Sequence, residues 1–142
     1  MSPGPAVAVA ATFVWLGMLL AISFLEAPLK FRAPGVTLQI GLGIGRLVFR
    51  ALNRAEILCS VVILITLVVS RPPVSVIVAV GIVITSLAAQ LLAVRPRLTR
   101  RSDAVLAGQN AAGRSRGHYA YVALEAAKLI ALAVGGIVLL AS

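Results

Sequence analysis

Acidic side chains are scarce in this chain, which has four Asp or Glu residues against 13 Lys or Arg residues in a length of 142. Charged residues of both signs make up only 12% of the sequence, whereas hydrophobic residues make up 61%. A soluble domain of this size has too little interior to bury so much apolar surface. The scarcity of charge therefore excludes a soluble globular protein and predicts an integral membrane protein.

Cysteine, histidine and aromatic residues are also few, and each shortage excludes a class of function. The single cysteine, Cys59, cannot form an intrachain disulfide or a paired-thiol redox motif. The single histidine, His118, leaves a metal or haem site without the several ligands that such sites need. Aromatic residues, at 5%, do not interleave with the basic residues as base stacking requires. We therefore expect no cofactor, no metal and no nucleic-acid partner.

Four apolar segments are long enough to cross a membrane, namely residues 6–24, 40–69, 75–94 and 119–141. Each can supply the roughly 20 residues that a helix needs to span a hydrocarbon core about 30 Å thick. The first segment has no Lys or Arg ahead of its long apolar run, so we expect a retained anchor rather than a cleaved signal peptide. The sequence predicts an all-α, polytopic membrane protein with four transmembrane helices, in a single transmembrane domain over residues 1–142.

Basic residues gather in two of the three connections between these segments. They occur in and after residues 27–39 and within residues 95–117, whereas the connection between the second and third spans has only Arg71. Cytoplasmic loops carry the excess of Lys and Arg, so we expect both basic loops in the cytoplasm and both termini outside. We expect this arrangement in a plasma or inner membrane, with the basic residues against anionic lipid headgroups.

The sequence also contains an internal repeat. Residues 46–56 align without a gap over residues 118–128, and a proline-marked basic turn precedes each segment. A hairpin of two spans begins and ends on the same side of the membrane, so its two copies are related by an axis along the membrane normal. We therefore predict two parallel helical-hairpin repeats, over residues 6–70 and 75–142.

Polar residues recur along one face of the second and fourth spans. Steps of three, four and three residues place each set on one stripe of a helix. The first stripe is Arg46, Phe49, Asn53 and Glu56, and the second is His118, Tyr121, Glu125 and Lys128. The repeat predicts three pairs across the bundle, which are Glu56 with Lys128, Asn53 with Glu125, and Arg46 with His118. The first of these is an ion pair, because an unpaired charge in lipid costs at least a few kcal/mol.

These residues form a candidate intramembrane polar cluster, which Glu26 at the end of the first span could also reach. Its members are Glu26, Arg46, Asn53, Glu56, His118, Tyr121, Glu125 and Lys128. One interpretation is structural, in which polar contacts fix the helix register and each is worth under about 1 kcal/mol. The other is functional, in which the cluster lines a cytoplasm-facing cavity. Ionisable residues within membrane spans favour the functional interpretation. Long side chains near the end of a span can also reach the membrane surface, which favours the structural one.

Other small and polar residues are assigned to packing. Gly41 and Gly45 form a small-residue pair that allows two helices to approach closely, and Gly135 and Gly136 can do the same. Trp15 is predicted to face lipid or to pack against other helices. The serines of the spans, among them residues 23 and 60, are expected to bond the backbone of their own helices.

Short motifs in the first hairpin resemble those of known membrane families. They are Trp15 with Gly17, the turn of Glu26 and Pro28 followed by Phe31, and Arg46 with Phe49. In these the chain resembles small four-helix membrane families of unassigned function, among them the group around transmembrane protein two-hundred-and-five. The resemblance covers the first hairpin only, and it implies a four-helix membrane fold without naming an activity.

Two functions remain open at the level of the sequence. The first is a small integral membrane protein whose polar cluster binds or passes a small charged solute or protons. The alternative is a non-catalytic subunit or scaffold of a larger membrane complex. An enzyme is less favoured, because no nucleophile stands beside a general base. Small residues on the helix faces suit self-association, so we expect a homo-oligomer or a membrane-complex partner.

Overall fold

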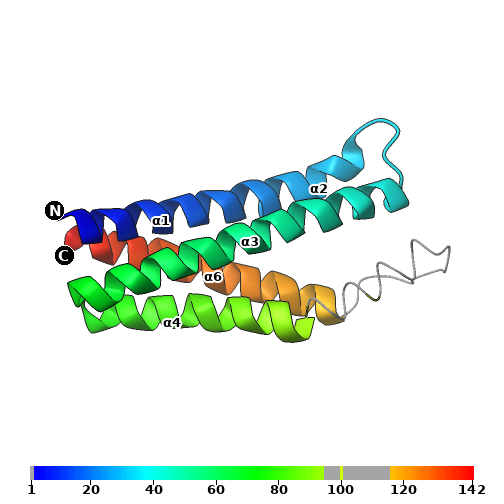
Figure 1. Ribbon diagram of the computed structural model, residues 1–142. Coiled ribbons are helices and arrows are strands. Elements are labelled where there is room, and N and C mark those ends of the chain that lie inside the picture. Colours follow the sequence, from blue (N-terminus) through cyan, green and yellow to red (C-terminus); the bar gives the residue numbers. More distant parts are fainter. Residues whose placement is uncertain (1, 95–99, 101–115) are drawn as a thin grey trace.

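The computed structural model describes residues 2–94, Arg100 and residues 116–142, and its regular structure in these ranges is helical (Figure 1). The predicted all-α class is therefore confirmed for the described part of the chain. Most of the second predicted basic loop, residues 95–117, lies outside the described residues.

Each half of the chain is a pair of long helices. The first hairpin consists of α1 (Pro3–Leu19), a π-helical segment η1 (Leu20–Glu26), the short α2 (Ala27–Leu29), a 3₁₀ turn η2 (Lys30–Arg32) and α3 (Leu38–Ser70). The second hairpin consists of α4 (Val74–Ala89), a π-helical segment η3 (Gln90–Val94) and α6 (Arg116–Ala141). The turn between α3 and α4 lies at the same end of the bundle as both termini (Figure 1).

The four long helices match the four predicted spans. By length and composition, the stretches that could cross a membrane are Pro3–Arg32, Leu38–Ser70, Val74–Leu92 and Tyr119–Ala141. Large apolar side chains are exposed along all of them, including Val14, Val68, Ile82 and Ile137. Continuous exposed apolar surface of this kind is suited to lipid rather than to water.

Local chemistry sets the ends of α3. Thr37 caps the first turn, because its Oγ1 accepts a hydrogen bond of 3.1 Å from the backbone N–H of Ile40. At the other end Arg71 adopts a left-handed conformation with φ of 46°. Pro72 and Pro73 follow it and cannot continue the helix, so the chain turns into α4.

Helix α1 is central to the bundle, because it packs against both α3 and α6, while α6 packs in turn against α4. The main apolar core combines residues of all four long helices: Trp15, Leu19, Leu52, Ile63, Val83, Leu87, Ala131 and Leu132. Helices α3 and α6 lie across the bundle from each other without close backbone packing. Only long side chains can connect them.

Glycines permit close contacts inside the bundle. A Cβ atom on Gly136 of α6 would lie 2.8 Å from the Phe13 ring of α1, and one on Gly41 would lie 2.2 Å from the Phe31 ring. Gly45 faces the Lys30 side chain in the same way, at 2.7 Å from Nζ. The small residues named in the sequence therefore pack against side chains of their own chain.

We expect Gly136→Ala to destabilise the bundle by about 1–3 kcal/mol, because the added methyl group would overlap the Phe13 ring. Gly17→Ala is the matched control, since a Cβ atom at Gly17 would meet nothing within 4 Å. Thermal unfolding in detergent should show a lower midpoint for Gly136→Ala alone. An equal effect of both substitutions would contradict this packing argument.

Candidate functional site

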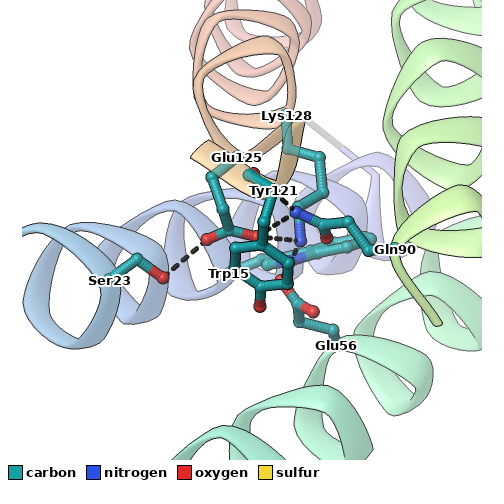
Figure 2. Close-up of polar contacts among 7 residues, drawn as sticks. All are labelled: Trp15, Ser23, Glu56, Gln90, Tyr121, Glu125 and Lys128. Carbon is teal, nitrogen blue, oxygen red and sulfur yellow. Dashed lines mark hydrogen bonds and ion pairs between the residues drawn. The ribbon is translucent and has the colours of Figure 1, made fainter. Parts of the chain in front are cut away.

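Two carboxylates and one ammonium group meet inside the bundle (Figure 2). Lys128 Nζ lies 2.6 Å from Glu56 Oε1 and 2.7 Å from Glu125 Oε1. The side chains of Glu56 and Lys128 are fully buried, and that of Glu125 is 2% exposed. We name these three residues the buried triad. The predicted ion pair between Glu56 and Lys128 is confirmed, and Lys128 also pairs with Glu125 on its own helix.

Three neutral side chains donate hydrogen bonds to the triad, so that all four spans contribute to it (Figure 2). Trp15 Nε1 of α1 donates to Glu56 Oε1 over 3.1 Å. Ser23 Oγ of η1 donates to Glu125 Oε2 over 2.5 Å, and Gln90 Nε2 of η3 donates to Glu125 Oε1 over 2.8 Å. Gln90 Nε2 also donates to the carbonyl oxygen of Tyr121, at 3.3 Å.

The two π-helical segments deliver two of these donors. Ser23 lies in η1 and Gln90 lies in η3, and each segment continues the first helix of its hairpin. A π-helix has i→i+5 hydrogen bonds and a wider turn than an α-helix. Side chains within it therefore point in directions that the 3.6-residue period of an α-helix does not predict. Both segments therefore present a donor to the same carboxylate, Glu125.

The structure overturns one assignment made from sequence, decides between two alternatives for another residue and adds a residue that the sequence analysis did not name. Ser23 was expected to bond its own backbone, but its hydroxyl donates to Glu125, because η1 turns it toward α6. Trp15 packs in the core, as one alternative predicted, and the lipid-facing alternative is wrong because the side chain is 1% exposed. Sequence reasoning missed Gln90, although it is the only amide or charged residue between residues 75 and 94, and this could have been the signal.

Asn53 lies on the predicted stripe, in surroundings that, within the described residues, leave its side-chain oxygen without a hydrogen-bond partner. The oxygens of Glu125 accept from Ser23 and Gln90 and pair with Lys128. Asn53 is 8% exposed, and its Oδ1 atom is buried with no hydrogen-bond partner in the described part of the structure. This oxygen is an acceptor, as the carboxylate oxygens of Glu125 are, so it cannot bond them. The predicted placement of Asn53 opposite Glu125 stays a prediction.

Glu26 belongs to a second group, nearer the end of the first span. Its Oε2 lies 3.9 Å from Lys30 Nζ, one turn further along the chain. The same Nζ lies 5.4 Å from the centre of the Phe31 ring and 5.7 Å from that of Phe49, which are cation–π distances. The Phe49 ring meets that of Tyr121 edge to face, with centres 5.9 Å apart. Lys30, Phe49 and Tyr121 thus form a series of contacts that leads from Glu26 to α6.

Arg46 lies in α3 and is half-buried, and His118 lies in the first turns of α6. The side chain of His118 is outside the described part of the structure. The predicted pairing of Arg46 with His118 therefore stays a prediction.

Two cavities in the described structure lie away from the triad. The first has a volume of about 10 Å³ and an apolar lining that includes Thr12, Ile63 and Val83. The second, of about 190 Å³, lies at the end of the bundle beside Ser70 and Arg71. No member of the triad lines either of them, although Trp15, which donates to Glu56, lines the first. The cytoplasm-facing cavity of the functional interpretation stays a prediction.

The electrostatics of the triad are unbalanced. Its two carboxylates and one ammonium group leave one negative charge when all three are ionised, and the ion pairs of both carboxylates go to Lys128. A net charge in an apolar, water-poor interior is costly. Within the described residues, no group of three or more His, Cys, Asp or Glu side chains could hold a metal ion. A proton is the smallest cation that can restore neutrality.

We expect Lys128→Met to be strongly destabilising, by about 3–5 kcal/mol, because it leaves two buried carboxylates without their common cation. Adding Glu56→Gln to this variant should recover part of the loss. Lys30→Met is the control, since Lys30 is partly exposed and pairs with Glu26 at the longer distance of 3.9 Å. Unfolding midpoints in detergent that fall equally for Lys128→Met and Lys30→Met would contradict the central role of Lys128.

Comparisons with known proteins assign no family to this site, because no family model, curated protein or solved structure matches the chain. The resemblance of the first hairpin to the group around transmembrane protein two-hundred-and-five stays a prediction. The function is therefore argued from the site alone.

Proposed function

We propose that this protein is a small integral membrane protein that binds and passes protons through the buried triad. The observation that carries this proposal is the uncompensated pair of carboxylates around Lys128, buried where all four spans meet. Ionisable residues enclosed by membrane-spanning helices are rare, and they mark ion pathways and proton relays.

The closed surroundings of the triad favour a proton over a larger solute. Its three side chains are at most 2% exposed, and neither described cavity reaches them. A solute with a hydration shell needs such a cavity, whereas a proton needs only hydrogen-bonding groups in sequence. Ser23, Glu125, Lys128 and Glu56 form a continuous sequence of this kind. The indole N–H of Trp15, which can only donate, holds Glu56 at one end of it.

This series covers only part of the membrane. Ser23 and Trp15 are eight residues apart along the first span, which corresponds to about 12 Å at 1.5 Å per residue. The hydrocarbon core is about 30 Å thick, so further groups, water or a conformational change must connect the triad to both surfaces. On the cytoplasmic side, the proposed route passes the Phe49 and Tyr121 rings, which contact each other between Glu26 and the triad.

The proposed orientation follows the distribution of basic residues. We place the connection that contains Lys30 and Arg32 in the cytoplasm, with both termini and Arg71 outside, in a plasma or inner membrane. Anionic headgroups would then contact the basic loops. A homo-oligomer or a membrane-complex partner is part of the same proposal.

The proposed parallel repeat has support from the arrangement of the helices. In each hairpin an α-helix is continued by a π-helical segment and is followed by a second long helix. The second helices, α3 and α6, contribute Glu56 and Lys128, which are equivalent positions of the sequence repeat. This pairing across the bundle is the one that two parallel hairpins would produce.

Proton flux in proteoliposomes tests the proposed activity. We expect the wild-type protein to dissipate an imposed pH gradient, and Glu56→Gln to reduce the rate at least tenfold, because the amide cannot take up and release a proton. Ser60→Ala is the matched control, since Ser60 is buried on α3 one turn beyond Glu56 and its hydroxyl bonds the Ile57 carbonyl of its own helix. This control should retain the wild-type rate.

Two outcomes of that assay would count against proton transfer. A wild-type rate equal to that of empty liposomes would favour the alternative of a non-catalytic subunit or scaffold. Equal rates for wild type and Glu56→Gln would show that any proton flux does not depend on the buried triad. Both variants must first give the wild-type elution profile in detergent.

Cysteine labelling tests the orientation, since Cys59 is the only native cysteine and can be removed by Cys59→Ala. In that background, a membrane-impermeant maleimide should label Ser142→Cys in intact cells and Ala33→Cys only after permeabilisation. Both positions are exposed in the structure. Labelling in the reverse pattern would place the termini in the cytoplasm and contradict the proposed topology.

A further inference from the structure

The hydrogen bonds around the two carboxylates differ in a way that locates the proton. Both oxygens of Glu125 have partners, because its Oε1 accepts from Gln90 and pairs with Lys128 and its Oε2 accepts from Ser23. In Glu56, Oε1 accepts from Trp15 and Lys128. The other oxygen, Glu56 Oε2, is buried with no hydrogen-bond partner in the described part of the structure.

An unpartnered carboxylate oxygen in an apolar interior carries the full cost of its lost hydration. That cost falls when the oxygen holds a hydrogen atom, because the group becomes neutral and gains a donor. A proton on Glu56 Oε2 also leaves Glu125 and Lys128 as a balanced ion pair. Protonation of Glu56 Oε2 therefore balances the charge of the triad and also gives this oxygen a hydrogen bond to donate.

Asn53 is the candidate acceptor for that hydrogen atom. It precedes Glu56 by three residues on α3, and residues at this spacing are neighbours on one helix face. Its Oδ1 is also buried without a hydrogen-bond partner in the described structure. Two acceptor oxygens cannot bond each other, but one hydrogen atom between them satisfies both.

The other groups packed around Glu56 do not provide an equivalent arrangement. Helix α6 brings Glu125 and Lys128, which are already paired, and α1 brings the neutral Trp15. On α3 itself, Arg54 is exposed, and the thiol of Cys59, three residues beyond Glu56, is only partly buried. From η3, Gln90 has an unpartnered Oε1, but its Nε2 holds it to Glu125 and to the Tyr121 carbonyl.

We propose that the resting protein holds its proton on Glu56 Oε2, shared with Asn53 Oδ1, so that Glu56 is the proton-binding residue and Asn53 its positioning residue. This inference deepens the proposed function and rests on it for its biological meaning. The ligand is a proton, and the site is a neutral carboxylic acid hydrogen-bonded to an amide. Transfer breaks the O–H bond at Glu56, and the proton passes to an acceptor along the route, leaving Glu56 as a carboxylate beside Lys128.

Infrared difference spectroscopy tests this inference without relying on transport. Protein at neutral pH should show the C=O stretch of a protonated carboxylic acid, which is lost on titration to alkaline pH. Labelling with ¹³C-glutamate should shift this band to lower frequency, since three of the four carboxyl side chains are glutamates and the fourth is Asp103. Glu56→Gln should abolish the band, whereas Glu26→Gln should leave it in place, because Glu26 pairs with Lys30 outside the triad.

Asn53→Leu tests the acceptor, because an acid that loses its hydrogen-bond acceptor absorbs at higher frequency. We expect the band to move upward in this variant and to remain unmoved in Ser60→Ala, the buried control on the same helix. Asn53→Gln, which keeps an amide but displaces it, should give a smaller shift and serves if Asn53→Leu does not fold. An unmoved band in every folded Asn53 variant would overturn the assignment of the acceptor.

The two proposals fail in different measurements. A band that survives Glu56→Gln, or no carboxylic acid band at all, would overturn the location of the proton whatever the liposome assay shows. A band that behaves as expected in a protein without flux would leave the proton site intact and contradict only the transport activity.

Discussion

Lys128 is the group on which the rest of the site depends, because a fully buried ammonium must have anionic partners close by. Its two partners come from different helices, Glu125 on its own α6 and Glu56 on α3. Helices α3 and α6 do not pack closely against each other, so this ion pair connects them across the centre of the bundle. The donors from the other two spans then bond both oxygens of Glu125 and one oxygen of Glu56. The position of one ammonium group therefore determines which side of each of the four helices faces the centre of the bundle.

Much of this arrangement was predictable, because the signals that predict it are local or repeated. An apolar run of about 20 residues indicates a span without any knowledge of its neighbours, and the four runs correspond to the four long helices. The Glu56–Lys128 pair followed from register within the repeat. Ser23 and Gln90 could not be placed by the same reasoning, because both lie in π-helical segments whose phase an α-helical pattern does not describe. The absence of a partner for Asn53 Oδ1 in the described structure depends on which donors pack around it, and that is a property of the packed chain.

The costs of burial bear on whether the triad is structural or functional. Interhelical hydrogen bonds within membranes contribute about 0.6 kcal/mol on average, so polar contacts are a weak means of holding helices together. Replacing a buried ion pair by well-packed apolar residues is often neutral or stabilising. The spans already have an apolar core around Trp15, Leu52 and Ile63. Stability alone therefore gives little reason for three ionisable groups at the centre of the bundle.

The imbalance within the triad is the stronger argument. A purely structural network is most stable when its charges cancel and each polar atom has a partner. This network has two acids for one base, and the oxygens of Glu56 and Asn53, like Oε1 of Gln90, are acceptors without donors in the described structure. One hydrogen atom would balance the charge and serve the first two of these oxygens, and it can leave and return without a cavity. A site whose charges balance with a proton and not without one has the two states that proton transfer requires.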